Sequence, residues 1–259
     1  MFQRRVESFL TEHRISAGVE RIEYLESVKW RRSDLSFFLV HLTKEDKERG
    51  LSAKQVLEEI ISPDSAGYCT LNGAPQGLFE RVASVPRESI TAVSFTEAPL
   101  DQVKHFAQPI PGDKNRNYSK FGLVFEQDFI RSNSGNPCFY LNTRFNDDLK
   151  KAALSIVDCP HFSSNPDCVK LLPYFSIFGK AGSAKEKKEI DFYWEREWRV
   201  PGSLRFRLDD LFVGLCEHDW VDYFEGLTQV PFICPDWNYD RILKQLRDWS
   251  RPRTAQPQK

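Results

Sequence analysis

The chain has 259 residues, of which 41% are hydrophobic, so it is long enough to bury a sizeable core and too apolar to be disordered. Its 36 basic and 37 acidic residues give a net charge of −1, which argues against an overall field that attracts nucleic acid or a membrane surface. The sequence has no apolar run near the roughly 18 residues of a membrane helix, and its first residues lack a signal-peptide core. We therefore expect a cytoplasmic protein.

In chain order, the first part of the sequence predicts a helix, a strand and a second helix. Residues 2–13 carry an apolar stripe at helical spacing, and residues 35–42 form a continuous apolar run typical of a buried strand. Ser52 then occupies an N-cap position with Gln55 three residues later, and together they predict a capping box at the start of an amphipathic helix.

A second strand is predicted at residues 90–95. Thr96 follows it as a candidate N-cap, with Glu97 at the positive end of the expected helix and Pro99 in its first turn. We therefore expect a strand that runs into a helix N-terminus, where backbone amides favour anionic groups.

The remaining elements alternate without an internal repeat or a dividing linker. Strands are predicted at 121–125, 138–141, around Glu197, at 204–206, around Val213 (a strand or a short helix) and at 230–234, and helices at 145–157, 167–178 and 239–249. Residues 180–189 are polar and predict a loop, and residues 250–259 predict a disordered tail. We expect a single domain over residues 1–249, of the α+β class.

The cysteine spacing does not predict a metal site. Cys159, His161 and Cys168 form the one cluster worth testing, but the sequence holds no second pair at zinc-site spacing. We expect the six cysteines to be small buried residues and expect no metal.

The segment 194–202, Trp-Glu-Arg-Glu-Trp-Arg-Val-Pro-Gly, brings two carboxylates into an aromatic strand. Alternation along a strand places Glu195 and Glu197 on one face and Trp198 on the other. Partly buried carboxylates are rare unless they are paired or functional. The alternative is an ordinary ion pair on a solvated face with one of three nearby arginines, Arg196, Arg199 or Arg205.

Three segments could together build one site. His41 and Thr43 end the first predicted strand, Ser94 and Thr96 end the second, and Glu197 lies in a third. Taken alone, a histidine at the end of an apolar strand is usually structural, and Ser-Phe-Thr-Glu is usually only a helix cap. In this order the three segments together indicate a functional site more specifically than any one of them does alone.

The order of these motifs resembles the ADP-ribosyltransferase fold, in particular that of the DarT-like toxins. Phe-Thr-Glu-Ala-Pro-Leu at 95–100, Phe-Gly-Leu-Val-Phe at 121–125 and the motif at 194–202 resemble the AbiGi-like family associated with abortive phage infection, over roughly residues 35–215. The resemblance implies an α+β fold of split antiparallel β-sheets with surrounding helices.

The resemblance also implies roles for individual residues. His41 and Thr43 would hold the adenosine-ribose side of NAD, Ser94 or Thr96 would support its nicotinamide end, and Glu197 would be the catalytic glutamate. No motif identifies the aromatic that stacks on nicotinamide; the candidates are Phe95, Tyr118 and Tyr140.

The chemistry fits two carboxylates. Transfer from NAD breaks an N-glycosidic bond through an oxocarbenium-like transition state, which a carboxylate such as Glu197 stabilises. Nicotinamide leaves without a strong general acid, and Glu195 could act as a base on the incoming nucleophile.

The polar segment before the motif is the expected acceptor site. Its cations and aromatics are of the kind that track phosphates and stack on bases: Lys185, Lys187, Lys188, Tyr193 and Trp194. The alternative is a solvated lysine loop followed by aromatics that point inward. By the resemblance, a nucleic-acid acceptor, either RNA or DNA, is favoured over a protein.

The sequence therefore predicts an NAD-dependent ADP-ribosyltransferase toxin of an anti-phage system, with a possible cognate antitoxin as partner. One alternative is a non-enzymatic antitoxin or sensor that keeps the fold without turnover. Another is a nuclease or other hydrolase that uses Glu195 and Glu197 with a metal.

Overall fold

The computed structural model describes most of the chain. The described residues are 35–80, 82, 84–107, 119–142, 148–158, 166–181, 188–190 and 195–250, with the backbone alone at 166, 178–181 and 188–190. The helix predicted at 2–13 lies outside these residues, as do residues 251–259 of the tail predicted at 250–259. Ser250 is helical, so the predicted tail is wrong at this residue.

A mostly antiparallel sheet forms the centre of the molecule. Its strands follow the order β13-β12-β5-β1-β4-β10-β6, with β3 also paired to β4, and only β12 and β13 run parallel. The bounds are β1 Phe38–Leu42, β3 Ala74–Pro75, β4 Thr91–Glu97, β5 Gly122–Glu126, β6 Asn136–Pro137, β10 Glu197–Pro201, β12 Leu211–Leu215 and β13 Phe232–Ile233. Together with the helices this sheet makes the fold α+β, as predicted.

The main hydrophobic core surrounds this sheet. Leu123, Val124 and Phe125, which are consecutive in β5, are all fully buried, so both faces of the strand are covered. This burial explains why the segment reads as a continuous apolar run rather than an alternating one.

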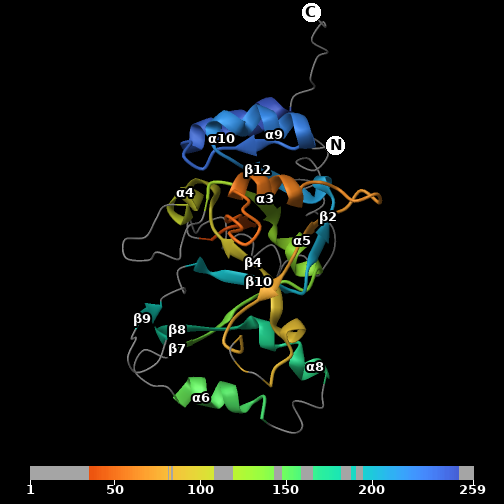
Figure 1. Cartoon of the computed structure of the whole chain (residues 1–259). Helices are drawn as coiled ribbons and strands as arrows, with labels where there is room; N and C mark the ends of the chain where they lie inside the picture. Colours follow the sequence, from red (N-terminus) through yellow and green to blue (C-terminus); the bar gives the residue numbers. More distant parts are fainter. Residues whose placement is uncertain are drawn as a thin grey trace, which may run out of the picture.

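The helices lie around the sheet and at the two ends of the molecule. In Figure 1, α9 (Val221–Thr228) and α10 (Tyr239–Ser250) lie together beyond β12, and α6 (Asp148–Ser155) lies at the opposite end. The amphipathic helix predicted after Ser52 is α3 (Ala53–Ile60), and its capping box is present. The sequence reading did not predict α9.

The strand predicted at 90–95 is longer than expected, and the helix start at Thr96 is wrong. β4 continues through Glu97, because Thr96 pairs with Val40 of β1 on one side and with Glu197 of β10 on the other. Helical turns begin only after Pro99, as the 3₁₀ helix η3 (Leu100–Gln102) and α4 (Val103–Phe106). Thr96 is therefore a strand residue between two neighbours and caps no helix.

A smaller sheet lies between the main sheet and α6 (Figure 1). It joins β7 (Phe139–Asn142) in parallel to β8 (Phe175–Ala181), which pairs antiparallel with β9 (Lys188–Ile190). The helix predicted at 167–178 is therefore wrong beyond its first turns, α8 (Pro166–Val169) and η4 (Leu172–Tyr174). The loop predicted at 180–189 is also wrong in part, because its two ends belong to the paired strands β8 and β9.

The remaining elements connect these parts. They are β2 (Cys69–Leu71), which pairs with β11 (Leu204–Phe206), α5 (Gln127–Ser132), and the 3₁₀ helices η2 (Arg87–Ile90), η6 (Leu208–Asp210) and η7 (His218–Trp220). α5 lies between the strands predicted at 121–125 and 138–141. Within the described residues, no helix is long and apolar enough to cross a membrane.

Candidate functional site

A pocket of about 600 Å³ opens where β1 and β4 part. The antiparallel ladder between them pairs Leu39 with Glu97 and Val40 with Thr96. The residues after Val40 on β1 and those before Thr96 on β4 line the pocket. α3, α4 and the β2–β3 segment supply its other walls. A cavity of this size is in the range of small-molecule and cofactor sites.

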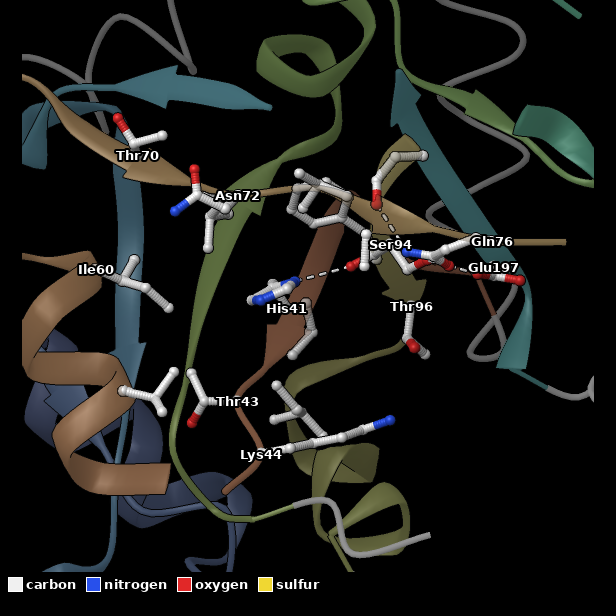
Figure 2. Close-up of a pocket in the computed structure, with 18 of the residues that line it drawn as sticks. His41, Thr43, Lys44, Ile60, Thr70, Asn72, Gln76, Ser94, Thr96 and Glu197 are labelled. Atoms are coloured by element: carbon white, nitrogen blue, oxygen red, sulfur yellow. Dashed lines mark hydrogen bonds between the residues drawn. The ribbon is translucent and has the colours of Figure 1, made fainter. Parts of the chain in front are cut away.

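Three of the predicted site residues meet in this pocket from adjacent strands. His41 comes from β1, Ser94 from β4 and Glu197 from β10, and Figure 2 shows the three side by side. Register explains part of this arrangement, because Glu197 lies directly opposite Thr96, and Arg199 lies opposite Ser94. Directly opposed residues share a face of the sheet, so these four side chains belong to one face.

His41 is held by the backbone of β4. Its Nδ1 lies 2.9 Å from the carbonyl oxygen of Ser94, and because a carbonyl only accepts, Nδ1 carries the hydrogen and Nε2 is the acceptor of the neutral ring. Burial lowers the pKa of His41 below its ordinary value of 6.5, with a further lowering from the charge of Lys44, against the opposing effect of the Ser94 hydrogen bond. The structure therefore favours a neutral imidazole.

Glu197 is ion-paired with Arg199. Nε and Nη2 of Arg199 donate to the two carboxylate oxygens at 2.9 Å each, and Ser94 Oγ donates to Oε1 at 2.6 Å. The side chains of Glu197 and Arg199 are only 12% and 4% exposed. An arginine partner was the alternative reading of this motif, but the pair is buried rather than on a solvated face.

The other two arginines have different partners. Arg196 Nη2 lies 3.2 Å from Glu97 Oε1, and Arg205 Nη2 lies 2.8 Å from Asp64 Oδ2. Of the three arginines, Arg199 is the one for which the structure shows an ion pair with a glutamate of the motif, Glu197.

Glu195 reaches the pocket by a different route from the predicted one. β10 begins at Glu197, and Arg196 adopts a left-handed backbone conformation with φ of 47°. The alternation that placed Glu195 and Glu197 on one strand face therefore does not apply. The turn nevertheless brings Glu195 to the pocket wall, where it is 6% exposed.

The two threonines differ in what their hydroxyls do. Thr43 Oγ1 lies 3.0 Å from the carbonyl oxygen of Ala53 and 3.1 Å from that of Phe121, so it joins the end of β1 to the start of α3 and to the chain before β5. Thr96 lines the pocket, and within the described part of the chain its hydroxyl has no hydrogen-bond partner. Thr96 is thus the threonine whose hydroxyl can bind a ligand without losing a structural bond.

Gln76 is a site residue that the sequence reading missed. Its Nε2 donates to the carbonyl oxygen of Ala92 at 2.7 Å, and its Oε1 contacts Ser94 Oγ. The single hydroxyl hydrogen of Ser94 can serve Gln76 or Glu197, but not both at once. Gln76 follows β3, which pairs with β4. No local pattern in the sequence predicts the contact between Gln76 and Ser94.

The candidates for a stacking aromatic have different places. Phe95 is 1% exposed and meets the Phe125 ring edge-on, so it belongs largely to the core. Tyr140 Oη accepts a hydrogen bond from the backbone N–H of Glu197 at 2.9 Å, and burial raises the pKa of Tyr140 above its ordinary range. Tyr118 lies outside the described residues.

The predicted acceptor residues are mostly not described. Lys185, Lys187, Tyr193 and Trp194 lie outside the described residues, and Lys188 belongs to β9, where only the backbone is described. Their part in the site stays a prediction.

The described cysteines and possible metal ligands do not form a second site. Cys69, Cys138, Cys216 and Cys234 are buried free thiols, and burial raises the pKa of Cys138, which lies near Glu197. Among the described residues, no group of three or more His, Cys, Asp or Glu side chains could hold a metal ion. Cys159 and His161 lie outside them.

Comparison of the chain with protein-family models, with curated proteins and with solved structures finds no match.

Proposed function

We propose that the protein is an NAD-dependent ADP-ribosyltransferase and acts as a toxin in an anti-phage system. The observation that carries this proposal is the convergence of His41, Ser94 and Glu197, from three adjacent antiparallel strands, on one pocket of about 600 Å³. The resemblance to the AbiGi-like and DarT-like proteins implies the same order of residue types, and the parting of β1 and β4 is compatible with the split sheets it implies.

Each residue has a role that its contacts allow. Neutral His41 accepts a hydrogen bond from a ribose hydroxyl through Nε2, because Nδ1 is bound to Ser94. Glu197 lies beside the ribose and stabilises the oxocarbenium-like transition state. Thr96, whose hydroxyl has no partner within the described residues, supports the nicotinamide end.

The transfer reaction needs only NAD, the acceptor and side chains of this protein. The N-glycosidic bond of NAD breaks, and its electron pair leaves with nicotinamide. The acceptor nucleophile then forms a bond to the ribose carbon and gives its proton to Glu195, which lies on the same pocket wall as Glu197. We assign the acceptor to nucleic acid, as the resemblance implies, with the lysines and aromatics at 185–194 as its expected contacts.

A second candidate is an antitoxin or sensor that keeps the fold without turnover. The observation that favours it is the bidentate Arg199–Glu197 pair. A carboxylate that is already neutralised by a guanidinium has less charge to offer a cationic transition state. Binding of a ligand in the pocket does not require that charge.

The test is incubation with NAD labelled in the adenosine half, together with separate pools of RNA, DNA and protein. The proposal expects nicotinamide release and transfer of the label to one pool, most strongly to nucleic acid. Glu197→Gln should lower the rate at least ~100-fold while the circular dichroism spectrum stays unchanged. Binding of NAD without nicotinamide release would favour the second candidate, and absence of both would overturn the NAD site itself.

A further inference from the structure

Arg199 connects Glu197 to the smaller sheet. While Nε and Nη2 bind the carboxylate, Nη1 donates to the carbonyl oxygens of Pro173 at 2.6 Å and Phe175 at 3.1 Å. The guanidinium is therefore fixed from two sides, by Glu197 in the main sheet and by the chain that enters β8. Burial is the largest single effect and lowers the pKa of Arg199, but the charge and hydrogen bonds of Glu197, together with the nearby Cys138 and Tyr140, raise this pKa above its ordinary value.

The space around the guanidinium is closed. Gly77 has φ of 83°, and a Cβ atom at this position would lie 2.6 Å from Nη1 of Arg199 and 2.4 Å from the Phe175 carbonyl oxygen. The backbone at Gly77 thus packs directly on the guanidinium. The Arg199 side chain is only 4% exposed, and its hydrogen bonds to Glu197 and to the Pro173 and Phe175 carbonyl oxygens hold the guanidinium in one orientation.

The carboxylate of Glu197 is oriented by these contacts. The terminal torsion of a glutamate is broad in the absence of partners. Here Oε1 accepts from Arg199 Nε and Ser94 Oγ, and Oε2 accepts from Arg199 Nη2. A carboxylate oxygen has two acceptor positions, and among the described residues Oε2 has a hydrogen bond only from Arg199, so its second position can accept from a ligand hydroxyl. Glu197 and Ser94 line the pocket, and Arg199 does not.

From these contacts we infer that Arg199 is the positioning residue of the site: it holds the Glu197 carboxylate in the single orientation in which Oε2 meets the ligand, without touching the ligand itself. The inference deepens the proposed function and rests on it where turnover is concerned. Its structural half, the coupling of the two side chains, is independent of NAD.

The experiment compares the wild type with R199Q, E197Q, the double variant R199Q/E197Q and R199K. A matched control is R205Q, because Arg205 also pairs with a carboxylate at 2.8 Å, but its side chain is 57% exposed. For each protein we would measure kcat and KM for nicotinamide release, the NAD dissociation constant by calorimetry, and the unfolding equilibrium constant in urea.

R199Q should lower kcat about 100-fold, the effect of a misplacement of about 1 Å, and change the NAD dissociation constant less than about threefold. The double variant should be no slower than E197Q, because Arg199 acts only through Glu197. Each single substitution should raise the unfolding constant at least about 100-fold, since it leaves a buried charge alone, and the double variant should unfold no more readily than either. R205Q should leave all these quantities within about threefold of wild type.

Additive effects would overturn the inference. If R199Q slows the reaction further on top of E197Q, or if the two unfolding effects multiply, Arg199 does not act through Glu197. If R199Q does not fold, R199K decides the matter, because its single ammonium keeps the charge but cannot bind both oxygens; wild-type kcat in R199K would also overturn the inference. A wild type without nicotinamide release refutes the proposed function, and the urea cycle still decides whether Arg199 holds Glu197.

Discussion

Ser94 Oγ lies 2.6 Å from Oε1 of Glu197, although 103 residues separate the two in the chain. The contact joins β4 to β10 in the lining of the pocket, and the carbonyl oxygen of the same serine accepts a hydrogen bond from His41. Ser94 is therefore the residue through which the histidine and the glutamate are fixed relative to one another.

Ser94→Ala should lower the rate of nicotinamide release about tenfold and cost about 1 kcal/mol of stability, because one hydrogen bond to a charged group is removed. Steady-state kinetics and urea unfolding measure the two effects. Ser84→Ala, at an exposed position, is the control and should change neither. An unaltered rate in Ser94→Ala would mean that the hydroxyl does not orient Glu197.

The lowered pKa of His41 predicts a loss of stability in acid. Burial makes the folded protein hold the His41 proton less tightly than the unfolded chain, whose ordinary value is 6.5. This contribution is therefore fully present above about pH 6.5 and is lost as the pH falls below it. Urea unfolding between pH 5 and 8 should show a steeper loss for the wild type than for His41→Gln. Parallel curves would show that His41 is not linked to folding.

Thr43→Val should destabilise the protein by about 1–3 kcal/mol and leave NAD affinity unchanged, because the Thr43 hydroxyl is bound to backbone carbonyls. Thr70 also lines the pocket, and Thr70→Val is the matched control for stability. Thermal unfolding and an NAD titration separate the two effects. Weaker NAD binding by a fully stable Thr43→Val would instead support the cofactor role that the resemblance implies.

Gly77→Ala should be more destabilising than Gly67→Ala. Both glycines have left-handed backbones, with φ of 83° and 81°, but the space beside Gly67 is open, whereas a Cβ at Gly77 collides with Arg199 and Phe175. Gly67→Ala therefore measures the backbone cost of about 1–2 kcal/mol, and Gly77→Ala should add about 1–3 kcal/mol of overpacking. Equal effects in urea unfolding would contradict the closed packing around the Arg199 guanidinium.

Replacement of Lys185, Lys187 and Lys188 with Ser should reduce label transfer to the acceptor and spare slow NAD hydrolysis. If the acceptor is a nucleic acid, the salt dependence of transfer should become shallower by about 1 for each phosphate that a lysine no longer binds. Transfer rates measured over a series of salt concentrations give this slope. If both transfer and slope stay at the wild-type values, these lysines are a solvated surface and a nucleic-acid acceptor loses its main support.

Local patterns in the sequence determined several elements by themselves. The capping box at Ser52 and the amphipathic stripe after it predicted α3, and the apolar runs predicted β1 and β5. These features depend on residues within a few positions of one another, so they can be predicted from the local sequence alone. His41, Ser94 and Glu197 were also identified from the sequence, by residue type and by the order of their segments along the chain.

The partners of these residues were decided only by the tertiary structure. Thr96 belongs to a strand rather than a helix cap because β1 and β10 pair with it from both sides. The left-handed Arg196 breaks the alternation that Glu195 seemed to follow. Glu197 is bound by Arg199, which is itself held by carbonyl groups before β8. These contacts join segments far apart in the chain, and their geometry depends on how two sheets pack, which no local periodicity encodes.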